Sequence, residues 1–268
     1  MLMRRAWLLG VLSIVVLAAC TSRRTQPGQR MIDPEKVVDL SYSFGPDTIY
    51  WPNGEAFELK RTSFERTPQG YWYASNDMCL PEHGGTHMDA PIHFGEGKRT
   101  CEQVPLSSCI GAAVVIDVRA QAAADRDYRL RLDDLRAWEE RNGSIPRGAI
   151  VILFSGWGQY WGDKKRYLGT DKQFDFLNLH FPGFSKEAAQ FLVRERDIAA
   201  LAVDTASIDH GPSQDFIVHQ IINGADKPGF ENLANVDRLP AQGATIVALP
   251  MKITGGSGGP ARVIAILP

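Results

Sequence analysis

The stretch Ala149-Ile150-Val151-Ile152-Leu153-Phe154 is the part of the chain that decides the fold. Six consecutive apolar residues, rich in Val and Ile, predict a strand covered on both faces. Ser185–Arg196 follows, with a serine that can cap a helix and apolar residues along one helical face, and Ile198–Val203 repeats the strand pattern. Strand, helix and strand in this order predict a β-α-β unit, with a right-handed crossover if the strands are parallel.

The rest of the chain extends the same alternation. Four more short strands rich in Val and Ile are predicted at Val37–Leu40, Ala112–Val118, Thr245–Leu249 and Arg262–Leu267. A second helix is predicted at Leu132–Arg141, before Asn142-Gly143 ends it. The fold class is therefore α/β.

The composition is that of a globular protein. The chain has 268 residues, 44% hydrophobic and 22% charged, with a formal charge of −2, which excludes disordered and fibrous classes. We expect neither nucleic acid nor an anionic membrane surface as the main partner. No linker or internal repeat interrupts residues 31–268, so they are expected to form one domain.

The N-terminus is typical of a targeting segment. Arg4 and Arg5 precede the apolar run Ala6–Ala19, which is short for a membrane span. Leu17-Ala18-Ala19-Cys20 resembles the lipobox of bacterial lipoproteins, so residues 1–19 are interpreted as a lipoprotein signal peptide and Cys20 as the lipidated residue. An ordinary cleaved signal and a transmembrane anchor are the alternatives.

The residues after Cys20 indicate how the protein would be attached to a membrane. Residues 20–30 are polar, with Pro27 and Gly28, and are predicted to be a flexible tether. Thr21 in place of Asp favours the outer membrane in a cell that has two. We therefore expect an exported protein, lipid-anchored to a bacterial membrane and facing the periplasm.

Three cysteines remain beyond the anchor: Cys79, Cys101 and Cys109. Their odd number and spacing predict neither a disulfide framework nor a thiolate metal site. A bond between Cys101 and Cys109 stays open, as do free or buried thiols.

The segment His83-Gly84-Gly85-Thr86-His87-Met88-Asp89-Ala90-Pro91-Ile92-His93 contains half of the chain's six histidines and a carboxylate. Imidazole nitrogens and a carboxylate oxygen are ligands that Zn²⁺ prefers and Mn²⁺ accepts. The glycines and prolines here oppose a regular helix. We therefore expect a loop that enters a short extended piece.

With this backbone we expect different roles for the residues of the segment. In an extended piece His87 and Asp89 point to one side, and Gly84-Gly85 can fold His83 back onto the same ion. His93 would lie about 13 Å beyond Asp89 unless Pro91 bends the chain. That distance favours acid/base chemistry for His93 over a further ligand.

The same segment resembles the HxGTHxDxPxH signature of the cyclase family of metal hydrolases, which includes arylformamidases and isatin hydrolases. The similarity continues at 204–209, 216–219 and 230–240, and covers nearly the whole chain from Trp51-Pro52 onward. It implies a swivelling β/β/α domain, a mixed sheet with flanking helices. It also implies a homodimer or larger homo-oligomer.

The resemblance implies five metal ligands. His83, His87 and Asp89 would bind a first divalent ion, Zn²⁺ or Mn²⁺. In members with two ions, Asp89 bridges to a second ion held by His219 and Glu231. Since other members work with one ion, the count stays open at one or two.

The resemblance also implies the chemistry. His93 matches the catalytic acid/base and Trp51 a substrate-contacting residue, which predicts hydrolysis of an amide-type C–N bond in a small aromatic formamide or cyclic amide. Tyr71, Trp72 and Trp157 are candidates for stacking on this substrate or for ordinary core positions. A lipoprotein that binds metal or an aromatic ligand without catalysis, and a lactone or polyketide cyclase, are the alternatives.

Gly255-Gly256-Ser257-Gly258-Gly259 matches the G-x-S-x-G pattern of a nucleophile elbow. No acidic residue or histidine follows it, and Pro260 opposes the helix that an elbow needs. A glycine-rich turn between the last two strands is predicted instead.

Overall fold

Three of the four parallel strands form the centre of an eight-stranded sheet. They are β5 (Ile110–Asp117), β7 (Ile150–Phe154) and β9 (Ala200–Val203), which lie side by side in that order. Every residue of β7 and β9 is buried, as the apolar runs predict. The parallel pairing of β7 with β9 confirms the expected β-α-β unit.

This structure is a computed structural model, and it describes residues 32–268. Residues Asp33–Pro268 form one compact unit. The predicted signal peptide at 1–19, the lipidated Cys20 and the tether at 20–30 lie outside the described residues. No helix between residues 32 and 268 is long and apolar enough to cross a membrane.

The sheet closes on itself. Its order is β1-β12-β11-β5-β7-β9-β10-β4, with an additional pairing of β12 with β4. The first part of β12 pairs with β4 and its last part with β1, so β12 joins the two ends of the sheet. The other five strands are β1 (Val37–Asp39), β4 (His87–Asp89), β10 (Gly229–Glu231), β11 (Gln242–Pro250) and β12 (Gly258–Ile266). Of these, β10 is parallel to its neighbour β9, and the remaining four make only antiparallel pairs.

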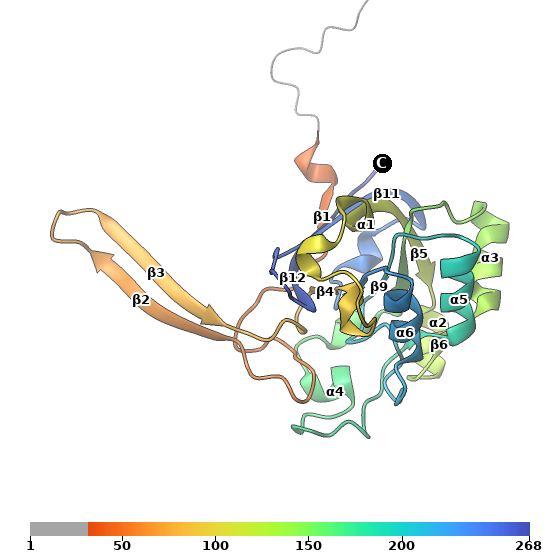
Figure 1. Cartoon of the computed structure of the whole chain (residues 1–268), viewed down its shortest axis with the longest axis horizontal. Helices are drawn as coiled ribbons and strands as arrows, with labels where there is room; N and C mark the ends of the chain where they lie inside the picture. The colour runs from red at the N-terminus through yellow and green to blue at the C-terminus, as the bar shows by residue number, and fades with distance from the viewer. Residues whose placement is uncertain (1–31) are drawn as a thin grey trace, which may run out of the picture. The chain divides into compact units, whose positions relative to one another are not determined.

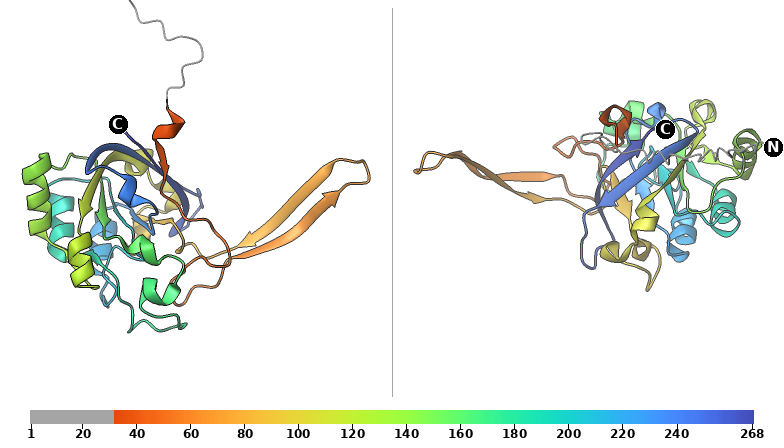
Figure 2. Two further views of the ribbon diagram at one scale, coloured as in Figure 1. Left: turned by 180° about the vertical axis from the view of Figure 1, so that it is seen from behind. Right: turned by 90° about the horizontal axis from the view of Figure 1, so that it is seen from above.

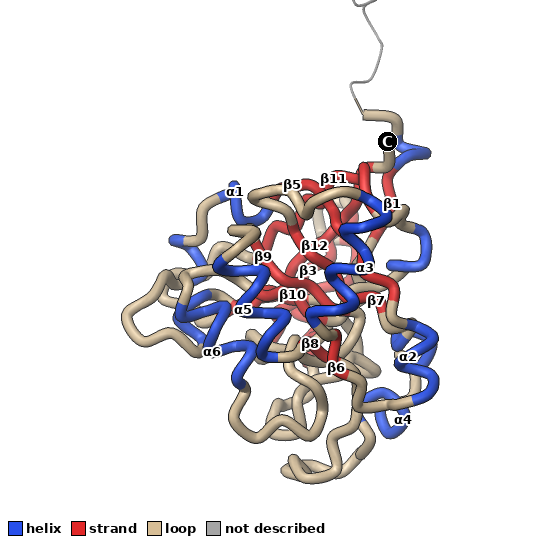
Figure 3. Tube along the Cα trace, turned by 90° about the vertical axis from the view of Figure 1, so that its right-hand side faces the viewer, coloured by secondary structure: helices blue, strands red, loops and turns tan. Residues whose placement is uncertain are grey.

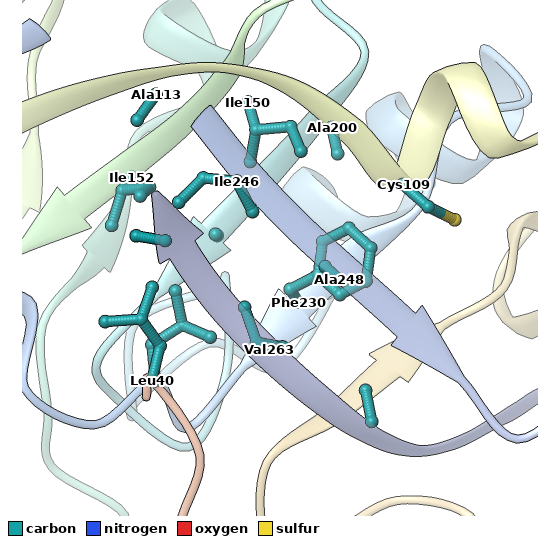
Figure 4. Close-up of a cluster of buried hydrophobic side chains, with 14 of the residues drawn as sticks. Leu40, Cys109, Ala113, Ile150, Ile152, Ala200, Phe230, Ile246, Ala248 and Val263 are labelled. Atoms are coloured by element: carbon teal, nitrogen blue, oxygen red, sulfur yellow. The ribbon is translucent and has the colours of Figure 1, made fainter. Parts of the chain in front are cut away.

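The interior of this barrel is one of the hydrophobic cores. Alternate residues of each strand point into it, because successive side chains of a strand face opposite sides. Figure 4 shows Ile150, Ile152 and Ala200 from the parallel strands meeting Ile246 and Val263 from the antiparallel side. The last two strands, β11 and β12, thus contribute directly to the core.

Helices cover the outer face of the parallel strands (Figure 3). The main ones are α3 (Leu132–Asn142), α5 (Lys186–Arg194) and α6 (Ile217–Gly224). The Ser185 side chain accepts a hydrogen bond from the Ala188 amide at the start of α5, which confirms the predicted cap. The described residues also form the short helices α1 (Leu106–Cys109), α2 (Arg119–Ala124) and α4 (Lys164–Leu168). A small separate sheet consists of the parallel strands β6 (Arg129–Leu130) and β8 (Gly183–Phe184).

A long hairpin was missing from the predicted strands. Strands β2 (Glu58–Arg66) and β3 (Trp72–Cys79) pair with each other and with no other described strand. They project away from the barrel as an arm, shown in orange in Figure 1 and from two other directions in Figure 2. We refer to residues 58–79 as the arm.

Two further predictions concern local features. Residues 251–257 connect β11 to β12 and include a turn at Thr254-Gly255, which confirms the turn predicted for the glycine-rich stretch. Cys79, Cys101 and Cys109 are all free thiols, so the structure contains no bond between Cys101 and Cys109.

Candidate metal centre and active site

Strand β4 presents His87 and Asp89 to a pocket, and Met88 between them points into the barrel core. The predicted extended piece is therefore confirmed. On the neighbouring strand β10, Glu231 pairs directly with His87, and Phe230 faces the core. The alternation of two adjacent strands thus places the three predicted metal ligands His87, Asp89 and Glu231 on one surface.

The loop before β4 brings His83 to the same place. Gly84 and Gly85 have φ angles of 152° and 57°. A Cβ atom on Gly84 would lie 2.0 Å from the Tyr50 ring. Both the backbone conformation and this close approach require glycine. This agrees with the prediction that Gly84-Gly85 folds His83 back toward the site.

The glycine-rich turn holds His83 from the other side. The Ser257 hydroxyl is 2.9 Å from His83 Nε2 and donates to Glu82 Oε2 at 2.6 Å. A Cβ atom on Gly258 would lie 2.4 Å from the Met88 carbonyl oxygen. Ser257 is therefore part of the site, where it positions His83 instead of serving as a nucleophile.

His219 comes from helix α6 on the opposite wall. Its Nδ1 lies 2.8 Å from Asp209 Oδ2, which also accepts a hydrogen bond from the His219 amide. His87 Nδ1 lies 3.0 Å from the Gly85 carbonyl oxygen. Because these partners accept hydrogen bonds, they leave both Nε2 atoms free to face the centre of the site.

The two carboxylates lie between these imidazoles. Asp89 Oδ1 is 2.7 Å from His83 Nδ1 and 3.2 Å from His87 Nε2, whereas Oδ2 is 3.2 Å from His219 Nε2. Glu231 Oε2 is 3.5 Å from His87 Nε2, and Oε1 is 3.4 Å from His219 Nε2. Each carboxylate therefore offers one oxygen to each side of the cluster.

The electrostatics of the site favour a bound cation. Burial raises the pKa of Glu231, and the neighbouring Asp89 carboxylate raises it further. Burial also opposes ionisation of Asp89, but its imidazole neighbours, His87 foremost, hold the Asp89 pKa well below its usual range. His87 Nε2 is buried without a well-aligned hydrogen-bond partner. Such a set of nitrogens and carboxylate oxygens suits Zn²⁺ or Mn²⁺.

His93 lies closer to the predicted metal ligands than an extended chain would place it. Pro91–His93 is a 3-10 helix, so Pro91 bends the chain, and the separation of about 13 Å expected for an unbent chain does not apply. The His93 ring stacks on His83 with centroids 3.9 Å apart. One His93 nitrogen lies within 4.8 Å of ligand atoms of Asp89 and His219. Burial lowers the pKa of His93 to about 3, so the ring is uncharged at neutral pH.

These residues form the floor of a pocket of about 510 Å³. Its upper wall is aromatic and includes Trp51, which lies where a substrate contact is predicted. The Phe216 ring lies 6.1 Å from Trp51 and 5.3 Å from Phe94, measured between ring centroids. Among residues 32–268, no lysine or arginine lines this pocket.

The other aromatic candidates do not line this pocket. Tyr71 and Trp72 are exposed on the arm, and Trp157 is buried, where its Nε1 donates to the Tyr167 carbonyl. The hypothesis that they stack on substrate in the pocket of their own chain is therefore wrong. Phe94 and Phe216 line the pocket instead. Neither was predicted to line the pocket, although Phe94 directly follows the segment 83–93 and Phe216 lies within the segment 216–219, both quoted for the family resemblance.

Comparison with protein families agrees with this geometry. Residues 38–210, more than half of the chain, match the Cyclase family model, described as "Putative cyclase". An isatin hydrolase of Roseibium aggregatum is 31% identical over 257 residues, which cover 90% of this chain and 95% of that protein. A kynurenine formamidase of Erythrobacter litoralis is 26% identical, over 85% of this chain and 93% of that protein.

Solved structures show the same architecture. Isatin hydrolase A from Ralstonia solanacearum matches with a TM-score of 0.79 and 34% identity, covering 87% of this chain and 92% of that one. An isatin hydrolase bound to the product analogue thioisatinate also has a TM-score of 0.79, with 32% identity and the same coverage. The α/β prediction with flanking helices is thus confirmed, and the chain belongs to the cyclase family.

Proposed function

We propose that this protein is a metal-dependent hydrolase that cleaves an amide-type C–N bond in a small aromatic substrate. The observation that carries the proposal is the pair of buried carboxylates, Asp89 and Glu231, which each face both His87 and His219 within 3.5 Å. The names of the relatives support the reaction class, because isatin is a cyclic amide and a formamidase acts on a formamide.

We assign the metal ligands as two overlapping sets. His83, His87 and Asp89 would hold the first divalent ion, and His219 and Glu231, with Asp89 between the sets, would hold a second. When bound, a divalent ion polarises a carbonyl group and lowers the pKa of water toward about 7. Zn²⁺ and Mn²⁺ both suit the donors, with one or two ions in the site.

We assign His93 as the residue that moves a proton. Its ring stands beside the ligands and at the pocket floor, where a ring nitrogen can take a proton from water and return it to the departing nitrogen. A metal ligand role is the competing assignment, because His93 also lies near Asp89 and His219.

His93→Ala separates these two roles. As acid/base, its loss lowers kcat by about 10²- to 10⁴-fold and leaves the metal content unchanged. His210→Ala is the control, since His210 is half-buried outside the pocket. If His93→Ala loses metal in proportion to activity, the acid/base assignment fails.

The pocket favours a substrate without charged groups. Its walls are mainly aromatic and aliphatic, and Glu55 at the rim would repel a carboxylate. N-formylkynurenine carries a carboxylate that no lysine or arginine of the described pocket lining would neutralise, whereas isatin carries no charge. An isatin-type cyclic amide is therefore the first candidate and an aryl formamide the second.

The direct test is hydrolysis by metal-loaded protein, with isatin and N-formylkynurenine assayed in parallel. We expect turnover of isatin with the higher kcat/KM. A lactone in a third assay tests the alternative of a lactone or polyketide cyclase. If the protein binds isatin but hydrolyses neither isatin, nor N-formylkynurenine, nor the lactone, it is better explained as a non-catalytic binding protein.

We further propose that the protein is exported and anchored by a lipid on Cys20, in the outer membrane facing the periplasm. Arg4 and Arg5, the apolar run of residues 6–19 and the small residues before the cysteine support this location. Wild-type protein should incorporate labelled fatty acid and remain with membranes. Cys20→Ser should do neither, and labelling of that variant would contradict the assignment.

A further inference from the structure

Three buried hydrogen bonds connect helix α4 to His87 in the metal centre. The Tyr167 hydroxyl lies 2.9 Å from Asn232 Oδ1, and Asn232 Nδ2 donates to the Gly85 carbonyl oxygen at 2.8 Å. The same carbonyl oxygen lies 3.0 Å from His87 Nδ1. Tyr167 is fully buried, and Asn232 and His87 are each 2% exposed, so these bonds are shielded from solvent. We refer to the three bonds as the Tyr167–His87 link.

The direction of each bond in the link follows from its central acceptor. A backbone carbonyl accepts hydrogen bonds and cannot donate, so Asn232 turns its amide nitrogen toward Gly85 and its amide oxygen toward Tyr167. The Tyr167 hydroxyl is therefore the donor to Asn232. His87 Nδ1 is also a donor, and in a neutral imidazole this leaves the Nε2 lone pair for a metal ion.

The Gly85 carbonyl needs such an external restraint. Gly85 has a φ angle of 57°, and a Cβ atom there would lie 2.6 Å from the Phe44 ring. Glycine is therefore required, although it adopts positive and negative φ about equally readily and fixes its own peptide poorly. The hydrogen bond from Asn232 supplies the orientation that the glycine backbone does not.

Asn232 is itself held at every polar atom. Its amide donates to the Thr205 carbonyl oxygen, and its own carbonyl oxygen accepts from the Thr86 hydroxyl. Its φ angle is 56°, in the left-handed region that asparagine adopts more readily than most residues. The Tyr167 hydroxyl holds the remaining side-chain oxygen.

Tyr167 is fixed in turn by two tryptophans. Trp157 Nε1 donates to the Tyr167 carbonyl oxygen at 2.8 Å. The Trp161 ring meets the Tyr167 ring edge to face, with centroids 5.2 Å apart. The link therefore starts from a rigid aromatic cluster and ends at the ring of His87.

We propose that Tyr167 and Asn232 are positioning residues for metal binding. They fix the Gly85 carbonyl, and this carbonyl sets both the orientation of the His87 ring and the nitrogen that carries its proton. The inference rests on the metal centre of the proposed function. It adds that helix α4, which contributes no residue to the pocket lining, controls the affinity of that centre.

A matched pair of asparagines tests the middle of the link. Asn232→Gly removes the side chain and keeps the left-handed backbone accessible. Asn235→Gly is the control, because Asn235 has a φ angle of 52° and its Nδ2 donates to the Asp39 carbonyl oxygen outside the pocket. In a chelator competition, Asn232→Gly should raise the dissociation constant for Zn²⁺ about 10- to 100-fold, as for other partners of metal-binding histidines. Asn235→Gly should match wild type.

A matched pair of tyrosines tests its start. Tyr167→Phe removes one hydroxyl and should raise the dissociation constant for Zn²⁺ about tenfold, the lower end of the same range. Tyr128→Phe is the control, since the Tyr128 hydroxyl is hydrogen-bonded to Asp134 at 2.7 Å outside the pocket, and it should match wild type. In the Asn232→Gly background Tyr167→Phe should have no further effect, because residues that act through one another are not additive.

Melting temperatures of the metal-free variants measure the structural cost of each substitution separately from metal affinity. A wild-type protein that binds Zn²⁺, with equal affinity in Tyr167→Phe and Asn232→Gly, would overturn this inference and leave the metal centre intact. Equal losses of affinity within either matched pair, or a full effect of Tyr167→Phe in the double variant, would also overturn it. If Tyr167→Phe does not fold, the asparagine pair decides alone. A wild-type protein that binds no Zn²⁺ would overturn the metal centre and this inference together.

Discussion

Phe216 occupies a backbone conformation that is unfavourable for a bulky residue. Its φ and ψ angles are 48° and 43°, and the helix α6 that it begins is capped by the Asp209 side chain, which accepts hydrogen bonds from the Val218 and His219 amides. A left-handed conformation costs a residue with a Cβ atom about 1–2 kcal/mol. Because its ring forms part of the pocket wall, the strain is consistent with a role in holding substrate.

Phe216→Gly tests that role. Glycine relieves the backbone strain and so offsets lost packing, and we expect the free energy of unfolding to change by less than about 1 kcal/mol. Loss of the aromatic wall should raise the KM for isatin about tenfold, as for an aromatic contact worth about 1 kcal/mol or more. Phe216→Leu keeps the bulk and should fall between. If both variants are as stable to urea as the wild type and keep its KM for isatin, Phe216 has no role in holding substrate.

Asp209 lies in the segment 204–209 quoted for the family resemblance, and no role was predicted for it. It holds the His219 ring through Nδ1, and such partners of metal-binding histidines are typically worth 10- to 100-fold in metal affinity. Asp209→Asn should weaken metal binding by that factor in a chelator competition. The exposed Asp215→Asn is the control. Equal affinities for the two variants would show that Asp209 only caps the helix.

At the scale of elements, Glu139 of α3 connects to Arg196, which follows α5. The two side chains form a bidentate pair at 2.6 and 2.8 Å, and Glu139 also accepts from the Ile145 amide. Hydrogen bonds from Arg196 hold the pKa of Glu139 below its usual value. The pair therefore stabilises the fold above a pH of about 4.5, and this contribution disappears as the pH falls through the lowered pKa.

Glu139→Gln should accordingly cost about 1.5 kcal/mol at pH 7, the lower end for hydrogen bonds to charged groups. The difference between wild type and variant should shrink between about pH 5 and pH 3. Urea unfolding at several pH values measures both. A difference that stays constant with pH would show that ionisation of Glu139 is not involved.

Elements with a strong apolar pattern could be predicted from sequence, and short or mixed ones could not. The pattern of Ala149–Phe154 is unambiguous, and β7 begins within one residue of it. Strands β4 and β10 have three residues each, too few for a period to appear. The strands of the arm were not predicted because charged residues alternate with apolar ones, and because the register shift at Arg61 interrupts the two-residue period of β2.

At the scale of the whole molecule, barrel closure assembles the site. Glu231 lies opposite His87 because β10 pairs with β4, and Ser257 reaches His83 because β12 pairs with β4 as well. The sequence resemblance named the five ligands, but long-range pairing of this kind leaves no local pattern. For that reason Ser257 was predicted only as part of a turn.

Metal binding should therefore stabilise the entire fold. A ligand that binds only the folded state adds about 2.7 kcal/mol at a concentration of 100 times its dissociation constant. Zn²⁺ or Mn²⁺ should raise the melting temperature of metal-free protein, and the shift should be lost in His87→Ala. An equal shift in that variant would indicate binding elsewhere on the chain.

Metal content is the measurement that tests the site most directly. Wild-type protein, loaded with Zn²⁺ or Mn²⁺ and dialysed, should retain one or two ions per chain by elemental analysis. His87→Ala and Glu231→Ala should retain less, whereas His180→Ala, at a histidine paired with Asp127 outside the pocket, should match wild type. Wild-type protein without metal, or with metal content that neither His87→Ala nor Glu231→Ala reduces, would contradict a metal centre at this site.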